Sequence, residues 1–170
     1  MRYRVQQFFR AITVRVKQED IEAALTVLPP GAQARFLAQS RQDQGHALAV
    51  FSTLKDAGHH SRDLLAAALL HDAGKAAAAI PAWQRAIIVL LEHYSSRTLS
   101  ALSQGEAKGL RRPFVIHARH SESGAAWAEE AGCSPITVAL IRRHHEPAAS
   151  AASTEQDELL KILQAADSIN

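Results

Sequence analysis

Apolar residues recur every three or four positions along most of this chain, and the strict alternation typical of strands is rare. Many of these runs are rich in alanine and leucine, which have high helix propensity. The pattern therefore predicts an all-α fold. We expect helices over about residues 5–16, 19–28, 32–39, 40–57, 61–70, 81–103, 112–131, 134–146 and 155–167.

The breaker Pro29-Pro30-Gly31 is the one internal boundary that the pattern suggests, because two prolines and a glycine do not continue a helix. We therefore expect a short N-terminal helical extension over residues 1–30 and a main domain over residues 31–170. A chain of 170 residues suits one domain that buries roughly two-thirds of its unfolded surface.

The first predicted helix has an apolar stripe from Val5 to Val16, with Arg4, Arg10 and Arg15 among the intervening positions. Most stripes of this kind are core faces, so we expect this helix to pack on the core. The lower-ranked alternative is a membrane-surface or nucleic-acid adaptor, because basic amphipathic helices also bind such surfaces.

The helix that begins after residue 80 is apolar nearly all round. Its large apolar residues are Trp83, Ile87, Ile88, Leu90 and Leu91. A helix of this kind is either deeply buried or half of a dimer contact, and the sequence leaves both readings open.

Composition indicates the class of protein and its cellular location. Hydrophobic residues make up 47% of the chain and charged residues 21%, as in an ordinary globular protein. The net charge of +2 gives no support for nucleic acid as a partner. Cys133 is the single cysteine, which excludes an internal disulfide. No apolar run is long enough to cross a bilayer or to form a signal peptide, so we expect a cytoplasmic protein without a transmembrane segment.

The strongest chemical signal follows the apolar run Leu64–Leu70, where His71-Asp72 stands at the end of a predicted buried helix. An imidazole and a carboxylate together suit a divalent metal that takes nitrogen and oxygen ligands. We expect Gly74 to allow a sharp exit from the helix and Lys75 to add a positive charge. The simpler alternative is that His71 only caps a helix terminus.

Other histidines and acids also stand at helix ends or on inward faces. His46 shares its predicted face with apolar residues, and the acid Asp167 follows the stripe of the last helix. A buried carboxylate needs a partner, which a metal ion would supply for the whole set. We discount His59 and His60, because turn histidines are usually solvated. The full set of candidate metal ligands is His46, His71, Asp72, His120, His144, His145 and Asp167.

From about Gln39 to the C-terminus, the order His46, His71-Asp72, Asp167 resembles the HD superfamily of metal-dependent phosphohydrolases. Members similar to the HDIG and HD-GYP types add three further features. These are a lysine after the His-Asp pair (Lys75), a histidine four residues before a glycine (His120 and Gly124), and a His-His-Glu segment (144–146).

The resemblance implies an HD-domain helical bundle with one or two divalent transition metals (Fe, Mn, Zn, Ni or Co). By this resemblance, His46, His71, Asp72 and Asp167 would hold the first metal. His120, His144 and His145 would complete a second metal site, with Asp72 bridging, and His117 is the rival of His120. The implied catalytic residues are Asp72 and Lys75: a metal-bound hydroxide would attack phosphorus while Lys75 binds a phosphoryl oxygen.

Three departures from the superfamily pattern limit the substrate. Residues 147–150 lack the Gly-Tyr-Pro segment of cyclic-di-GMP phosphodiesterases, so this substrate is unsupported. Gln42 replaces an acidic ligand of some relatives, which argues against a third metal. The sequence stops soon after Asp167, so we expect a pocket that is open, or closed by the N-terminal helices or a second subunit.

We therefore expect an HD-type hydrolase that acts on a small phosphorylated substrate, most simply a nucleotide. Phosphomonoester and phosphodiester substrates both remain open, and a homodimer is possible. The alternative is a signalling module with low or no activity that binds a nucleotide or a protein partner.

Overall fold

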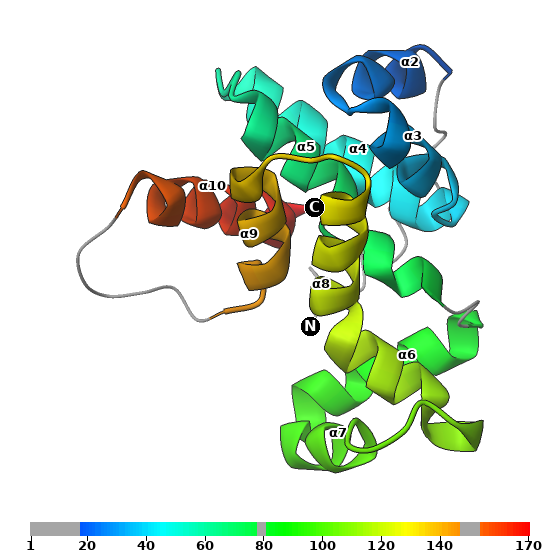
Figure 1. The fold of residues 1–170 in the computed structure, drawn as a ribbon. Helices are drawn as coiled ribbons and strands as arrows, with labels where there is room; N and C mark the ends of the chain where they lie inside the picture. Colours follow the sequence, from blue (N-terminus) through cyan, green and yellow to red (C-terminus); the bar gives the residue numbers. More distant parts are fainter. Residues whose placement is uncertain (1–17, 78–80, 147–153) are drawn as a thin grey trace.

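The computed structural model describes residues 18–77, 81–146 and 154–170 (Figure 1). Every regular element in these ranges is a helix, which confirms the all-α prediction. The helix predicted over 5–16 lies outside the described residues. In chain order the elements are α2 (Gln18–Val27), α3 (Pro30–Leu37), α4 (Arg41–Asp56), α5 (Arg62–Leu70), η1 (Ala73–Ala77), α6 (Ala82–Tyr94), α7 (Ser96–Leu102), η2 (Gly109–Arg111), α8 (Arg112–Glu130), α9 (Pro135–Arg143) and α10 (Glu155–Ile169).

Hydroxyl side chains cap the start of four helices, as residues of this type usually do. Ser40, Ser61 and Ser134 each accept a hydrogen bond from a backbone N–H three residues later. Thr154 and Asp157 form a reciprocal capping box at the start of α10. These caps explain why the predicted starts of α4, α5, α9 and α10 lie close to the observed ones.

Two predicted boundaries are wrong. The helix expected over 81–103 is divided into α6 and α7, because Ser95 has an extended φ of −155° that no helix accommodates. The helix expected over 134–146 ends at Arg143, and His144 is its C-cap residue. Both breaks occur without a glycine or proline at the break itself, so no helix-breaking residue marks them in the sequence.

The core is organised around α5. All seven residues of Leu64–Leu70 are buried, and a helix that is apolar all round must be covered on every side. Helices α2, α3, α4, α9 and α10 all contact α5. Helix α2 shares this core through Ile21 and Ala24, while the division into domains at residue 30 stays a prediction.

Helix α8 connects the core to a peripheral pair of helices. It packs against η1, α3 and α9, and near its start it also contacts α6 and α7. Figure 1 shows α6 and α7 at the lower end of the molecule, away from α2–α5. Among the side chains that the structure describes, none of α6 or α7 belongs to the main core cluster, and Trp83 and Leu90 are more than half exposed. Deep burial, the first of the two readings of the apolar helix after residue 80, is therefore wrong.

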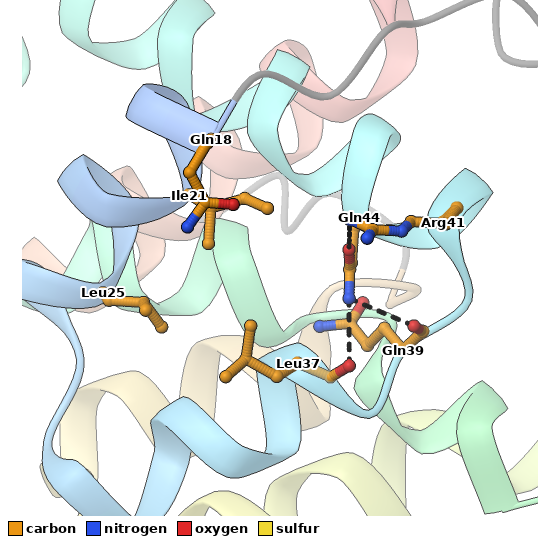
Figure 2. A pocket seen from close by; sticks show the side chains of 7 residues that line it. All are labelled: Gln18, Ile21, Leu25, Leu37, Gln39, Arg41 and Gln44. Atoms are coloured by element: carbon orange, nitrogen blue, oxygen red, sulfur yellow. Dashed lines mark hydrogen bonds between the residues drawn. The ribbon is translucent and has the colours of Figure 1, made fainter.

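A cavity of about 330 Å³ lies between α2, α3 and the start of α4 (Figure 2). Two buried amides organise its polar wall: Gln44 donates to the carbonyl of Leu37 over 3.0 Å, and Gln39 donates to the carbonyl of Leu69 over 2.9 Å. The second bond fixes the turn before α4 to α5, two residues before His71. The cavity is lined by Gln18, Ile21, Leu25, Leu37, Gln39, Arg41 and Gln44.

Within the described ranges, each helix is too short or too polar to cross a lipid bilayer.

Candidate metal centre

His71 and Asp72 lie in the interior of the protein, directly after the end of α5. α5 ends at Leu70, and the two side chains that follow are only 1% and 6% exposed. The expectation that a buried helix ends at the His-Asp pair is therefore confirmed. His71 does terminate a helix, but its imidazole also faces carboxylates, so capping alone does not account for it.

One cluster of potential ligands brings together three segments far apart in sequence: His46 of α4, His71, and Asp167 of α10. The Nε2 atom of His46 lies 2.8 Å from Oδ1 of Asp167, and Nε2 of His71 lies 3.4 Å from the same oxygen. Two imidazole nitrogens and one carboxylate oxygen therefore converge on one point, as the ligands of a transition metal do.

A second cluster consists of Asp72, His120 of α8, and the adjacent His144 and His145 after α9. Nε2 of His120 lies 3.3 Å from Oδ1 of Asp72, and Nε2 of His144 lies 3.9 Å from it. Nε2 of His145 lies 3.0 Å from Nε2 of His120. The rival residue His117 is not a member of this cluster.

Asp72 belongs to the second cluster and also lies beside the first. Its Oδ2 atom faces the first cluster, 3.6 Å from Nε2 of His71 and 4.0 Å from Nε2 of His46. Its Oδ1 atom faces His120 and His144. A carboxylate whose two oxygens face two separate ligand groups has the geometry of a bridging ligand.

Backbone carbonyls orient three of the imidazoles. In each case Nδ1 donates its hydrogen to the carbonyl three residues earlier, which fixes the tautomer and directs Nε2 into the cluster. The pairs are His71 with Ala68 (2.9 Å), His144 with Ile141 (2.7 Å) and His120 with His117.

The remaining nitrogens have the environment that metal ligands require. Nε2 of His71 and Nε2 of His144 are buried and have no hydrogen-bond partner in the part of the chain that the structure describes. An unsatisfied buried nitrogen is costly, and a bound cation would satisfy both. The donor set of imidazole and carboxylate groups therefore fits divalent transition metals.

A family profile described as the HD domain matches residues 44–170, which include every residue of both clusters. The chain belongs to the HD domain family. The resemblance read from His46, His71-Asp72 and Asp167 is thus confirmed, and members of the HD domain family are generally metal-dependent hydrolases. No curated protein and no solved structure matches the chain.

The carboxylates of the HD site favour positive charge on the groups around them. Burial alone would lower the pKa of His71, but the carboxylates of Asp72 and Asp167 raise it to about 9. Burial would likewise raise the pKa of Asp72, but Lys75, His71 and His120 hold it well below its ordinary value. Burial would raise the pKa of Asp167, but hydrogen bonds from His46 and His71 hold it well below its ordinary value. Both carboxylates therefore stay ionised in the interior, and a metal ion bound to His71 would displace the proton from its imidazole.

The second cluster contains neutral histidines. Burial, with His71 as a cationic neighbour, lowers the pKa of His144 to about 3. Partial desolvation and the proximity of His120 lower the pKa of His145, the one exposed member of the cluster, to about 4. Since a metal binds only the deprotonated nitrogen, these two imidazoles are ready to act as ligands near neutral pH.

Lys75 lies at the edge of both clusters. Its Nζ atom donates to Oδ2 of Asp72 over 2.6 Å, and the side chain is about one-quarter exposed. Burial would lower the pKa of Lys75, but its contact with Asp72 raises it, so the ammonium group stays charged. A fixed positive charge thus stands beside the carboxylate that lies between the two clusters.

Gly74 has a different role from the one we expected. We expected it to permit a sharp exit from the helix, but its φ angle is not among the positive ones. A Cβ atom at this position would lie 1.9 Å from the carbonyl oxygen of His120 and 2.9 Å from the backbone nitrogen of Gly124. Gly74 is therefore required because the backbone of α8 packs directly against it, which brings His120 close to Asp72.

Gln164 is a site residue that the sequence did not single out. Its Nε2 atom donates to the carbonyls of His144 (3.0 Å) and Glu146 (2.8 Å) at the end of α9. Gln164 lies one turn before Asp167 on α10, so it connects the helix of one cluster with the histidines of the other. A half-buried glutamine inside an amphipathic helix carries no signal of this role.

Replacing Gln164 with leucine is expected to weaken metal binding at the second cluster by about tenfold, because residues that orient ligands typically contribute this much. Binding at the first cluster should change little. Titration of the metal-free protein with Co²⁺, followed by its visible absorption, would resolve the two sites. The matched control is Gln156→Leu on the same helix, and equal effects of both variants would contradict the role of Gln164.

Proposed function

We propose that this HD domain protein is a metal-dependent phosphohydrolase that cleaves a phosphoester of a nucleotide or of a related small molecule. The observation that carries the proposal is the placement of Asp72, whose two carboxylate oxygens face two separate groups of histidines. Two-metal hydrolases of phosphoesters need such a shared ligand to keep both ions close together.

The two ligand groups have distinct assignments. His46, His71 and Asp167, with Oδ2 of Asp72, would hold one metal, and the other site would use Oδ1 of Asp72. Its further ligands would be His120, His144 and His145. When bound, a pair of divalent ions (Fe, Mn, Zn, Ni or Co) would activate a water molecule and neutralise negative charge on the phosphoryl group.

Lys75 would contribute substrate binding. Its ammonium group is held within 2.6 Å of Asp72 and remains partly exposed. In this place it can donate a charge-assisted hydrogen bond to a phosphoryl oxygen that reaches the centre. The role needs no proton transfer, which agrees with the raised pKa of Lys75.

The substrate class follows from what the chain lacks as well as from its site. Without the Gly-Tyr-Pro segment, cyclic-di-GMP is unsupported, whereas nucleoside monophosphates, bis-nucleoside polyphosphates and other cyclic nucleotides fit the proposal. The net charge of +2 supports a small substrate in preference to nucleic acid.

The single cysteine supports a cytoplasmic location.

Protein purified without chelators or a metal-affinity tag is expected to contain about two transition-metal ions per chain. Removing them with EDTA should lower the melting temperature by about 5–10 °C, because ions that bind only the folded state stabilise it. Elemental analysis and calorimetry measure the two effects. No metal after anaerobic loading with iron or manganese would contradict the proposal.

Activity is tested on the metal-loaded protein with p-nitrophenyl phosphate, bis-p-nitrophenyl phosphate and a panel of nucleotides. Hydrolysis of the first alone indicates a phosphomonoesterase, and hydrolysis of the second indicates a phosphodiesterase. A protein that binds two metals and nucleotides but hydrolyses none of these compounds would instead be the signalling module.

A further inference from the structure

Helix α6 carries two apolar stripes that face different directions. One stripe packs on the molecule, where Ile88 is 3% exposed and Leu91 is half-buried. The other stripe consists of Trp83, Ile87, Leu90 and Tyr94, which are 61%, 38%, 56% and 68% exposed. The second stripe thus presents large apolar side chains to solvent.

The exposed stripe has the geometry of a helix–helix contact. Its residues are spaced by four, three and four positions, so their Cα atoms fall within an arc of roughly 60° on one side of α6. This is the spacing of a coiled-coil seam. Figure 1 shows α6 at the lower end of the molecule, away from α2–α5.

We propose that this stripe is a homodimer interface in which α6 packs antiparallel against α6 of a second copy. The stripe reads aromatic, aliphatic, aliphatic, aromatic in both directions, with its centre between residues 88 and 89. A two-fold axis at this centre pairs Trp83 with the partner's Tyr94 and Ile87 with the partner's Leu90. Such self-complementarity is what a symmetric dimer interface requires of a single patch.

The exposed area is sufficient for this contact. The four side chains expose roughly 500 Å² per copy, so a dimer would bury about 1,000 Å² in total, which is close to the lower limit for specific interfaces. An interface of this size dominated by two aromatic pairs is expected to give micromolar affinity. Dimerisation leaves both metal clusters intact, because they use none of these residues.

Analytical ultracentrifugation of the full chain tests the proposal. The wild-type protein is expected to be a dimer at about 100 µM, and Leu90→Glu should raise the dissociation constant at least about tenfold. The matched control is Val89→Glu, because Val89 is 49% exposed on the same helix but points away from the stripe. Helical circular dichroism and metal content should be unchanged in both variants.

A wild-type chain that stays monomeric at this concentration would overturn the proposal, even if it binds vesicles of anionic lipid. An equal loss of dimer in Val89→Glu and Leu90→Glu would also overturn the assignment to this stripe.

Disulfide cross-linking tests the antiparallel direction through the distance between paired residues. In a Cys133→Ser background, Trp83→Cys and Tyr94→Cys chains are oxidised separately and as a mixture. Antiparallel packing places the two identical cysteines roughly 16 Å apart, beyond the reach of a disulfide, so only the mixture should form cross-linked dimers. Cross-links in the separate samples, or none in the mixture, would contradict the packing.

Discussion

The Asp72→Asn variant is expected to lose hydrolytic activity by at least about 1,000-fold, because the change removes the charge that both metal clusters share. Asparagine keeps the shape of the side chain, so the helices should form. The amide can still offer one oxygen to one cluster but cannot bridge two cations. The amount of bound metal should therefore fall at both sites. Elemental analysis measures the bound metal, and single-turnover kinetics measures the loss of activity.

The matched control for Asp72→Asn is His46→Gln. His46 lies within 2.8 Å of Asp167 and belongs only to the first cluster. This variant should therefore retain about one metal per chain, at the second cluster. If Asp72→Asn keeps two metals or most of its activity, Asp72 is not the bridge, and the two-metal assignment fails.

Local parts of the site could be predicted from sequence because they depend on local rules. The all-apolar run of α5 predicted a buried helix, and a buried helix that ends at His71-Asp72 brings these residues into the interior. The capping serines fixed where α4, α5 and α9 begin. These features rest on propensity and periodicity, which any short window of sequence contains.

The assembly of the clusters could not be derived in this way. His46 and Asp167 are 121 residues apart, and periodicity only placed each on an inward face. It was the resemblance to the HD superfamily that associated them. Gln164 was missed because its role depends on the crossing of α9 and α10, to which no local pattern points.

The two readings of α6 show the same limit. Periodicity identified a helix that is apolar nearly all round. Which of its faces pack against other helices depends on the tertiary structure. The structure covers the face of Ile88 and leaves that of Trp83 and Leu90 exposed. The sequence thus identifies a helix with more apolar residues than one core face needs, but it does not identify what packs against the rest.

Among residues that are not proposed metal ligands, Gly74 is the one whose substitution should destabilise the fold most. Gly74→Ala is expected to lower the free energy of unfolding by about 3 kcal/mol, because a backbone carbonyl 1.9 Å from the new Cβ cannot move as a flexible side chain could. For a chain of this size, this corresponds to a melting temperature about 10 °C lower. If α8 shifts to relieve the clash, His120 moves away from Asp72, so metal binding at the second cluster should also weaken.

Gly124→Ala is the matched control, because Gly124 lies on the other side of the same crossing of η1 and α8. Its Cβ would lie 3.3 Å from the nitrogen of Gly74 and 3.4 Å from Cγ2 of Ile141, so small movements would accommodate it. Alanine also gains up to about 1 kcal/mol of helix propensity within α8, and the net change should be near zero. Thermal unfolding and Co²⁺ titration of both metal-free variants measure the contrast. Equal stability of the two variants would show that the close approach of α8 is not what requires glycine at residue 74.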